Sequence, residues 1–248
     1  METAEAPATV PAGMRAVILA GGLGTRLGAV LGDRAKPLMP VAGRPFVAYL
    51  LQRLARQGVA EAILCVGHRA DLVRAALGDG LAGGPRLRYS EERELLGTGG
   101  ALKLAADLIG PEPFFVLNGD SFFAADLPAL RRAHDARGAL ATLALAKVLD
   151  VGRYGAVEMG PDGAIRRFAE KGAAGTGVIN AGVYVFGRAV LDAIPPGRVV
   201  SLERDVFPGL VGRGFYGVPG AGYFVDIGVP EDYARLGDDP RRLLAAVG

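Results

Sequence analysis

A glycine-rich turn followed by two cations is the part of this 248-residue chain that most clearly suggests chemistry. The apolar segment Ala16–Leu19 leads into the turn Gly21–Gly24, and Arg26 and Lys36 come shortly after it. Glycines let backbone N–H groups curl around phosphate oxygens, because no Cβ blocks the approach. The two cations would supply the positive charge that a triphosphate needs. The pattern predicts a phosphate site after a buried strand, although a tight turn also explains the glycines alone.

The turn does not match the two commonest phosphate-binding motifs. It lacks the G-x-G-x-x-G spacing of dinucleotide-binding proteins, and no G-K-[ST] follows it as in a P-loop. The missing spacing argues against a dinucleotide-dependent oxidoreductase, which is one alternative for an enzyme with a glycine turn after its first strand.

Two aspartates stand where an apolar residue would serve packing better. Asp120 ends the apolar segment that begins at Phe114, and Asp226 lies inside the apolar run Tyr223–Gly228. A charged side chain in such a run is costly unless it is paired or bound to a metal. Carboxylate oxygens are suitable ligands for a divalent cation. For Asp120, a turn aspartate that caps the next helix remains an alternative.

The elements that must position these residues follow an alternating pattern over the first 150 residues. Apolar runs typical of buried strands alternate with segments whose apolar residues recur at helical spacing. Alternation of this kind predicts a mainly parallel sheet with helices on both faces and ligands beyond the carboxyl ends of the strands. The expected strands are 16–19, 62–66, 87–90, 114–117 and 142–146, and the expected helices are 46–57, 71–77, 100–108 and 127–137.

The pattern changes after residue 150. Residues 156–159 and 165–168 flank Asp162-Gly163 and predict a β-hairpin. A strand over 178–186 and short helices over 188–194 and 201–210 follow, the last with Ser201 as its N-cap. We expect one domain over 14–248, in which residues 151–236 form an extension that packs on residues 14–150 and provides the other wall of a cleft.

Composition excludes several classes of protein. The net charge is +2 with scattered basic residues, which argues against nucleic-acid binding. No apolar run reaches the roughly 18–20 residues that cross a bilayer, so no membrane partner is expected. Residues 1–13 lack the features of a signal peptide and are expected to be a disordered tail. The single cysteine, Cys65, allows no disulfide within the chain and suits a buried core position in a cytoplasmic protein.

The stretch GGLGTRL at 21–27 and the later KPL at 36–38 resemble the signature of the sugar-1-phosphate nucleotidyltransferases. The resemblance extends over residues 14–236 and implies a nucleotide-binding half (14–150) and a sugar-binding half (151–236). It implies an α/β, Rossmann-like fold of the nucleotide-diphospho-sugar transferase (GT-A-like) type: a mainly parallel mixed sheet with helices on both faces and a small β-rich extension on the sugar side. It also implies an enzyme that joins an NTP to a sugar 1-phosphate and releases pyrophosphate.

The resemblance assigns roles to individual residues. Asp120 and Asp226 match the two family aspartates that hold Mg²⁺, the implied cofactor. Arg26 would contact the leaving pyrophosphate, Lys36 the α-phosphate and Lys171 the attacking phosphate. The implied nucleotide site comprises Leu19, Ala20, Gly21, Gly22, Gly24, Thr25, Arg26, Lys36, Glu91, Gly97, Thr98 and Gly119. Its base-binding part, the loop 96–101, could instead be a glycine turn before a helix.

The implied sugar-phosphate site lies in the second half of the chain. It comprises Gly155, Glu170, Lys171, Asn180 and Glu203. Glu170-Lys171 looks like the family's E-K motif, in which the glutamate accepts hydrogen bonds from sugar hydroxyls. An exposed charge pair at the end of a hairpin is the alternative for these two residues.

Three segments resemble the D-glycero-α-D-manno-heptose 1-phosphate guanylyltransferases in particular: the loop 96–101, residues 201–208 and residues 223–233. This resemblance favours GTP and that heptose phosphate as substrates. Mannose-1-phosphate guanylyltransferases, and uridylyl- or thymidylyltransferases acting on N-acetylmuramate or glucose 1-phosphate, share most of the motifs. A non-catalytic nucleotide-sugar sensor is a further alternative, against which the presence of both cations and both aspartates argues. Oligomeric state, including a homo-oligomer, and pathway stay open.

Overall fold

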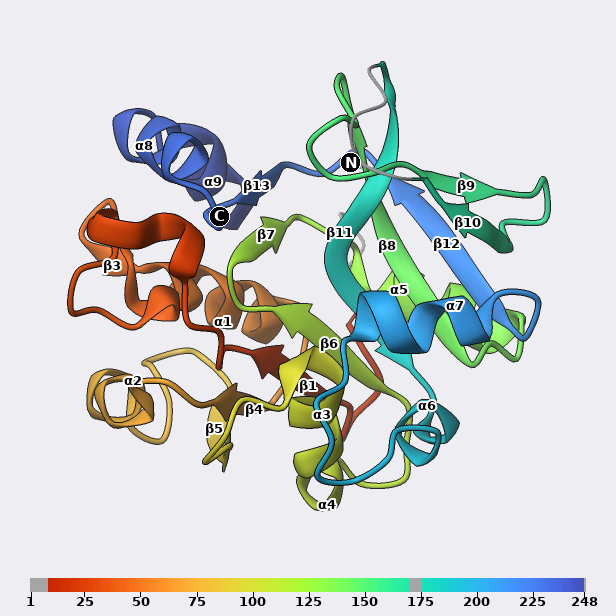
Figure 1. Ribbon diagram of the computed structural model, residues 1–248, viewed down its shortest axis with the longest axis horizontal. Coiled ribbons are helices and arrows are strands. Elements are labelled where there is room, and N and C mark those ends of the chain that lie inside the picture. Colours follow the sequence, from red (N-terminus) through yellow and green to blue (C-terminus); the bar gives the residue numbers. More distant parts are fainter. Residues whose placement is uncertain (1–8, 170–174, 248) are drawn as a thin grey trace, which may run out of the picture.

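The computed structural model describes residues 9–169 and 175–247, and a seven-stranded sheet forms its centre (Figure 1). The strands are β1 (Arg15–Leu19), β4 (Glu61–Val66), β5 (Arg86–Glu91), β6 (Phe114–Asn118), β8 (Ala141–Val148), β11 (Gly177–Phe186) and β12 (Phe215–Gly220). Their order is β12-β8-β11-β6-β1-β4-β5. β11 is antiparallel to both of its neighbours, whereas the other neighbouring pairs are parallel. The predicted mainly parallel, mixed sheet is confirmed.

Helices cover both faces of this sheet. Side chains alternate along a strand, so Ala16 and Ile18 of β1 belong to one apolar cluster and Val17 to the other. Each cluster also contains buried residues of several α-helices. On the face of Ala16 these are α1 (Phe46–Arg56), α2 (Ala70–Leu77), α5 (Leu127–Ala136), α8 (Pro230–Asp238) and α9 (Arg241–Val247); on the face of Val17 they are α3 (Gly97–Leu104), α4 (Ala106–Ile109), α6 (Arg188–Asp192) and α7 (Phe207–Leu210).

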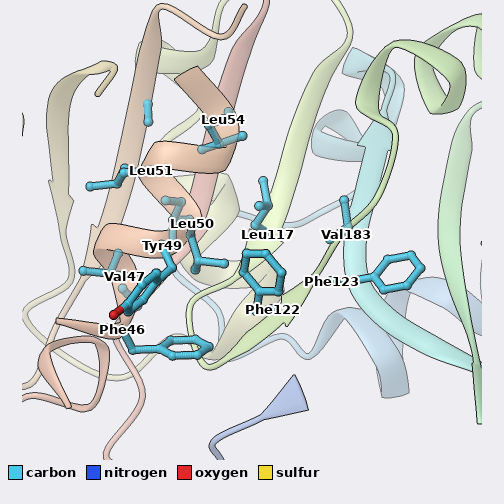
Figure 2. Packing of buried hydrophobic residues seen from close by; sticks show 14 of the residues in the cluster. Phe46, Val47, Tyr49, Leu50, Leu51, Leu54, Leu117, Phe122, Phe123 and Val183 are labelled. Carbon is cyan, nitrogen blue, oxygen red and sulfur yellow. The ribbon is translucent and has the colours of Figure 1, made fainter. Parts of the chain in front are cut away.

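The core around α1 holds the segment that carries Asp120. Leu50 of α1 and Phe122 point toward one another beside Leu117 of β6, and all three are buried (Figure 2). Phe122 belongs to the short strand β7 (Ser121–Phe123) and is fully buried. Full burial of a large apolar side chain stabilises by about 1.5–3 kcal/mol. Burial of Phe122 therefore fixes the backbone two residues after Asp120.

Shorter elements complete the fold. β7 pairs in antiparallel fashion with β13 (Phe224–Asp226). Two helices from the C-terminal end of the chain, α8 and α9, lie beside η1 (Thr25–Val30) and α1 from its N-terminal part (Figure 1). The remaining elements are η2 (Lys36–Leu38), β2 (Pro40–Val41), β3 (Arg44–Pro45), β9 (Val157–Met159), β10 (Ile165–Phe168) and the π-helical turn η3 (Leu202–Val206).

The chain after residue 150 does more than form an extension. The predicted hairpin is confirmed as the antiparallel pair β9–β10. β11 and β12, however, enter the main sheet on either side of β8. The two expected halves therefore share one sheet, with the hairpin projecting from it (Figure 1).

Two helical segments differ from their predicted form. The segment expected as one helix after Ser201 is η3 followed by α7, and Ser201 caps it by accepting a hydrogen bond from the Arg204 N–H. The helix expected at 100–108 begins earlier, at Gly97, and is divided into α3 and α4. A Cβ on Gly97 would lie 2.6 Å from the Val200 carbonyl oxygen and one on Gly100 2.5 Å from that of Arg198. Glycine is therefore required where the start of α3 packs on residues 198–200.

The first described residues pack on the domain. Val10 is buried, and its N–H donates to the Gln57 carbonyl oxygen at 2.9 Å. Residues 1–8 of the predicted tail (1–13) lie outside the part of the chain that the structure describes. Over 9–169 and 175–247, the structure has no helix with the length and apolar character needed to cross a membrane.

Candidate active site

A pocket of about 460 Å³ opens at the carboxyl ends of β1 and β6. Parallel strands present their carboxyl ends at one sheet edge, which is where ligands bind in such folds. Most of the predicted nucleotide residues, one of the two predicted metal ligands and one predicted sugar residue line it. They are Leu19, Ala20, Gly21, Gly22, Thr25, Arg26, Lys36, Gly97, Thr98, Gly119, Asp120 and Glu203.

The glycine turn forms one wall of the pocket. A Cβ on Gly22 would meet nothing within 4 Å, so the space above this residue is open. Gly24 adopts a φ of 65° and leads into η1, which carries Arg26. Gly119 lies against the end of β1, because its N–H donates to the Leu19 carbonyl oxygen at 2.9 Å. The wall therefore combines exposed backbone with an exposed guanidinium, as a phosphate site requires.

Lys36 and Asp120 form an ion pair inside the pocket. Lys36 Nζ lies 2.5 Å from Asp120 Oδ2, and the side chains are 10% and 32% exposed. Lys36 begins η2, in which Pro37 is buried, so the backbone that carries the ammonium group is anchored in the core. The lysine thus reaches the pocket from a fixed position.

Asp226 reaches Asp120 through the pairing of β13 with β7. Asp226 lies opposite Ser121 in this pair, and the Ile227 N–H donates to the Asp120 carbonyl oxygen at 2.9 Å. Asp226 Oδ1 accepts a hydrogen bond from the Gly228 N–H at 2.6 Å. Burial, and then the negative charge of Asp120, raise the pKa of Asp226, and its hydrogen bond, Lys36 and Arg26 offset part of that rise. The two predicted aspartates therefore share one electrostatic environment.

This pair of carboxylates fits a divalent cation. Two like charges held close together, one of them largely buried, are stabilised by a dication between them. Mg²⁺ characteristically takes one or two carboxylates and completes its shell with water and substrate phosphates. No cluster of three or more His, Cys, Asp or Glu side chains suited to a metal occurs in the described residues. The donor set accordingly fits an ion shared with phosphates rather than one enclosed by protein.

Residues from the second half of the chain also line the pocket. Glu203 of η3 lines the pocket, and Asn180 Nδ2 donates to its Oε1 at 3.4 Å and to the Tyr184 hydroxyl at 3.0 Å. Gly155 is not among the lining residues; it adopts a φ of 85° in the turn after Val151. The predicted residues Glu170 and Lys171 lie outside the described part of the chain.

In the part of the pocket near the loop 96–101, where the base is expected to bind, one lining residue differs from the prediction. The Glu91 carboxylate faces away from the pocket and pairs with Arg74 at 3.2 Å, whereas the next residue, Glu92, is buried and lines the pocket. Successive side chains of a strand point to opposite faces, so a shift of one residue reverses the direction. The residue types of this segment do not distinguish Glu92 from Glu91, so the packed structure decides which of the two lines the pocket.

Comparison with known proteins matches this architecture. A family model described as Nucleotidyl transferase matches residues 15–240. The chain is 40% identical over 234 residues to a mannose-1-phosphate guanylyltransferase of Mycobacterium tuberculosis, covering 93% of this chain and 65% of that protein. It is 36% identical over 223 residues to a D-glycero-alpha-D-manno-heptose 1-phosphate guanylyltransferase of Aneurinibacillus thermoaerophilus, covering 90% of this chain and 96% of that protein.

Solved structures show the same fold. HddC from Yersinia pseudotuberculosis matches with a TM-score of 0.82 and 34% identity, over 92% of this chain and 100% of that one. The same protein complexed with GMP-PN matches with a TM-score of 0.81 and 33% identity, over the same shares of both chains. With the family model covering nearly the whole sequence, the chain belongs to the nucleotidyl transferase family and has its nucleotide-diphospho-sugar transferase fold.

Proposed function

We propose that this chain is a sugar-1-phosphate guanylyltransferase, which transfers GMP from GTP to a sugar 1-phosphate and releases pyrophosphate. The observation that carries the proposal is that the glycine turn, Arg26, Lys36 and Asp120 line one pocket, while the pairing of β13 with β7 brings Asp226 beside Asp120. The names of both relatives above as guanylyltransferases, and the GMP-PN complex of the HddC structure, support GTP as the nucleotide.

The favoured acceptor is D-glycero-α-D-manno-heptose 1-phosphate. Support comes from the heptose enzyme, which matches along 96% of its length, and from the three segments named in the sequence analysis. Mannose 1-phosphate is the second candidate, because the mycobacterial mannose enzyme shares 40% identity with this chain.

On the nucleotide side, the chain's task is to position the triphosphate and neutralise its charge. Arg26 would contact the leaving pyrophosphate and Lys36 the α-phosphate. The attacking group is a phosphate oxygen that is already ionised, so no strong general base is needed. The transfer then forms one P–O bond at the α-phosphorus and breaks the bond to the β-phosphate.

Asp120 and Asp226 would hold Mg²⁺ in this proposal. When bound, the ion supplies positive charge to the phosphate oxygens on which negative charge accumulates. Lys36 Nζ already contacts Asp120 Oδ2, so lysine and cation compete for that oxygen. With Asp120 holding the ion, the Lys36 ammonium group would be available to contact the nucleotide phosphate.

On the sugar side, Glu203 and Asn180 already form one hydrogen-bonded unit at the pocket wall. They would orient the sugar hydroxyls, with Gly155 and Glu170 completing that subsite and Lys171 contacting the attacking phosphate. The proposal retains the cytoplasmic location expected from the sequence.

The test is pyrophosphate release by the purified chain, measured with four NTPs against heptose, mannose, glucose and N-acetylmuramate 1-phosphates. We expect the highest kcat/KM for GTP with the heptose phosphate. A value at least about tenfold higher for mannose 1-phosphate would favour the second candidate, since tenfold corresponds to about 1.4 kcal/mol of transition-state binding. No pyrophosphate release from any pair would refute the enzymatic proposal.

A further inference from the structure

Helix α8 carries a buried carboxylate that lies outside the pocket. The helix follows β13 along the chain and lies beside it (Figure 1). Asp232 belongs to its first turn, and the side chain is 6% exposed. We propose that Asp232 is a positioning residue, which holds the turn 151–155 at a fixed place relative to β13 and Asp226. This inference rests on the proposed function, in which that turn serves the sugar phosphate and Asp226 the metal ion.

An ion pair with Arg153 joins Asp232 to the turn. Arg153 Nη1 donates to Asp232 Oδ1 at 3.0 Å, and Nη2 donates to Oδ2 at 2.6 Å, so the pair is bidentate. The Tyr154 hydroxyl donates to the same Oδ2 at 3.4 Å. A bidentate guanidinium–carboxylate pair fixes relative orientation as well as distance. Two successive residues of the turn are therefore tied to the start of α8.

The turn is closed by its own backbone. The N–H groups of Tyr154 and Gly155 both donate to the Val151 carbonyl oxygen, at 3.0 and 2.9 Å. Val151 is buried, so the base of the turn is anchored in the core. Because these bonds keep the turn compact, fixing Arg153 also places Gly155, which the proposed function assigns to the sugar subsite.

A second contact joins the turn to β13. The rings of Tyr154 and Phe224 meet edge to face, with centroids 5.5 Å apart and an interplanar angle of 83°. This is a favourable arrangement for two aromatic side chains. Phe224 and Asp226 belong to the same three-residue strand. Burial raises the pKa of Tyr154, Arg153 lowers it, and the charge of Asp226 raises it further, so the Tyr154 hydroxyl lies within the field of that carboxylate.

The start of α8 is also fixed on the nucleotide side. The hydroxyl of Tyr233, the residue after Asp232, donates to the Pro40 carbonyl oxygen at 2.7 Å. Pro40 begins β2, which comes shortly after η2, the element that carries Lys36. Asp232 therefore connects the turn 151–155 to a helix that is itself held against the segment of the pocket lysine.

A role in stability alone makes a different prediction. An ion pair that only stabilises the fold changes the melting temperature and leaves the kinetic constants of the folded protein unchanged. A positioning residue changes the constants for the substrate that it helps to place, because a displacement of about 1 Å costs about 100-fold in rate. Kinetics measured for each substrate separately therefore distinguish the two roles.

The test compares Arg153→Gln with the matched control Arg235→Gln. Arg235 pairs with the same carboxylate from within α8, whereas Arg153 brings the turn to it. The arginine side chains are 42% and 71% exposed, so both variants should fold. In Arg153→Gln we expect kcat/KM for the better of the heptose and mannose 1-phosphates to fall roughly 10- to 100-fold, mainly through a higher KM. The Kd for GTP, measured by calorimetry without sugar phosphate, should stay within about threefold of wild type. Arg235→Gln should keep both values.

A double-mutant cycle assigns the effect to the pair. Asp232→Asn should reproduce the loss seen in Arg153→Gln, and the double variant should lose little more than either single variant, because both remove one interaction. If Asp232→Asn does not fold, the two arginine variants decide the question alone.

Amide hydrogen exchange examines the turn independently of activity. Exchange at the N–H groups of Tyr154 and Gly155 should become faster in Arg153→Gln and stay at the wild-type rate in Arg235→Gln. Unchanged exchange in Arg153→Gln would overturn the inference whether or not the chain is an active enzyme. An unchanged kcat/KM for the sugar phosphate, an equal loss of GTP affinity, or the same loss in Arg235→Gln would overturn it as well. The transferase proposal is refuted separately, by a wild-type chain that releases no pyrophosphate.

Discussion

Replacing Asp226 by asparagine tests the two-aspartate site most directly. The amide has nearly the same shape as the carboxylate, and its Oδ1 can still accept the Gly228 N–H, which lies 2.6 Å away. What the variant loses is the negative charge beside Asp120. The change therefore separates the charge of this side chain from its packing.

The expected loss of turnover is large. Removing one preorganised group that stabilises charge in a transition state lowers kcat by about 10²–10³-fold. The fold should not suffer. Burial and Asp120 raise the pKa of Asp226, so at pH 7 its charge is less favourable in the folded than in the unfolded chain. A neutral amide removes that cost, and the melting temperature of the metal-free protein should be equal or higher.

The assay is kcat for pyrophosphate release at saturating GTP and sugar 1-phosphate, together with a thermal melt. Asp239→Asn is the matched control, because Asp239 is an exposed carboxylate paired with Arg241 and should leave kcat unchanged. Asp226→Asn with turnover within about threefold of wild type and an unchanged melt would show that the acid is structural. The metal assignment would then be wrong.

Three further predictions follow from the same site and core. Excess EDTA should abolish pyrophosphate release, and added Mg²⁺ should restore it; activity that survives chelation would contradict a metal-dependent mechanism. Arg26→Ala should weaken GTP binding by roughly 10- to 100-fold in calorimetry, whereas Lys171→Ala should leave GTP affinity nearly native and lose activity on the sugar phosphate. A large loss of GTP affinity in Lys171→Ala would place that lysine on the nucleotide side. Burial lowers the pKa of His134 to about 4 from its ordinary value of 6.5. Between these two pH values the unfolded chain binds a proton at this residue and the folded chain does not. The free energy of unfolding should therefore fall by about 3 kcal/mol as the pH drops from about 6.5 to about 4, and His134→Gln should remove that part of the acid sensitivity in urea titrations, or the inferred burial effect is incorrect.

Local patterns determined much of the fold. The segment 16–19 is apolar throughout, so it predicts a strand buried on both faces, and β1 occupies the sheet interior between β4 and β6. Apolar residues at helical spacing located α1, α2 and α5 to within about two residues. These predictions succeeded because strand and helix periodicity are properties of neighbouring residues.

Contacts between distant residues were decided by the tertiary structure. The approach of Asp226 to Asp120 depends on the pairing of β13 with β7, two three-residue strands about 100 positions apart whose sequences carry no sign of each other. The local sequence likewise does not reveal that β11 lies between β6 and β8 and runs antiparallel to both.

The distinction between what local sequence indicates and what tertiary packing decides also applies to single side chains of the pocket. The residue types of the glycine turn, Arg26, Lys36 and the aspartates indicated phosphate and metal chemistry from the sequence alone. That Glu92 rather than Glu91 faces the pocket, and that Gly97 and Gly100 accommodate the backbone of residues 198–200, emerged only from the packed chain. The physical reason is that residue type determines which interactions a side chain can make, whereas its direction and its distant neighbours are set by the packing of the whole core.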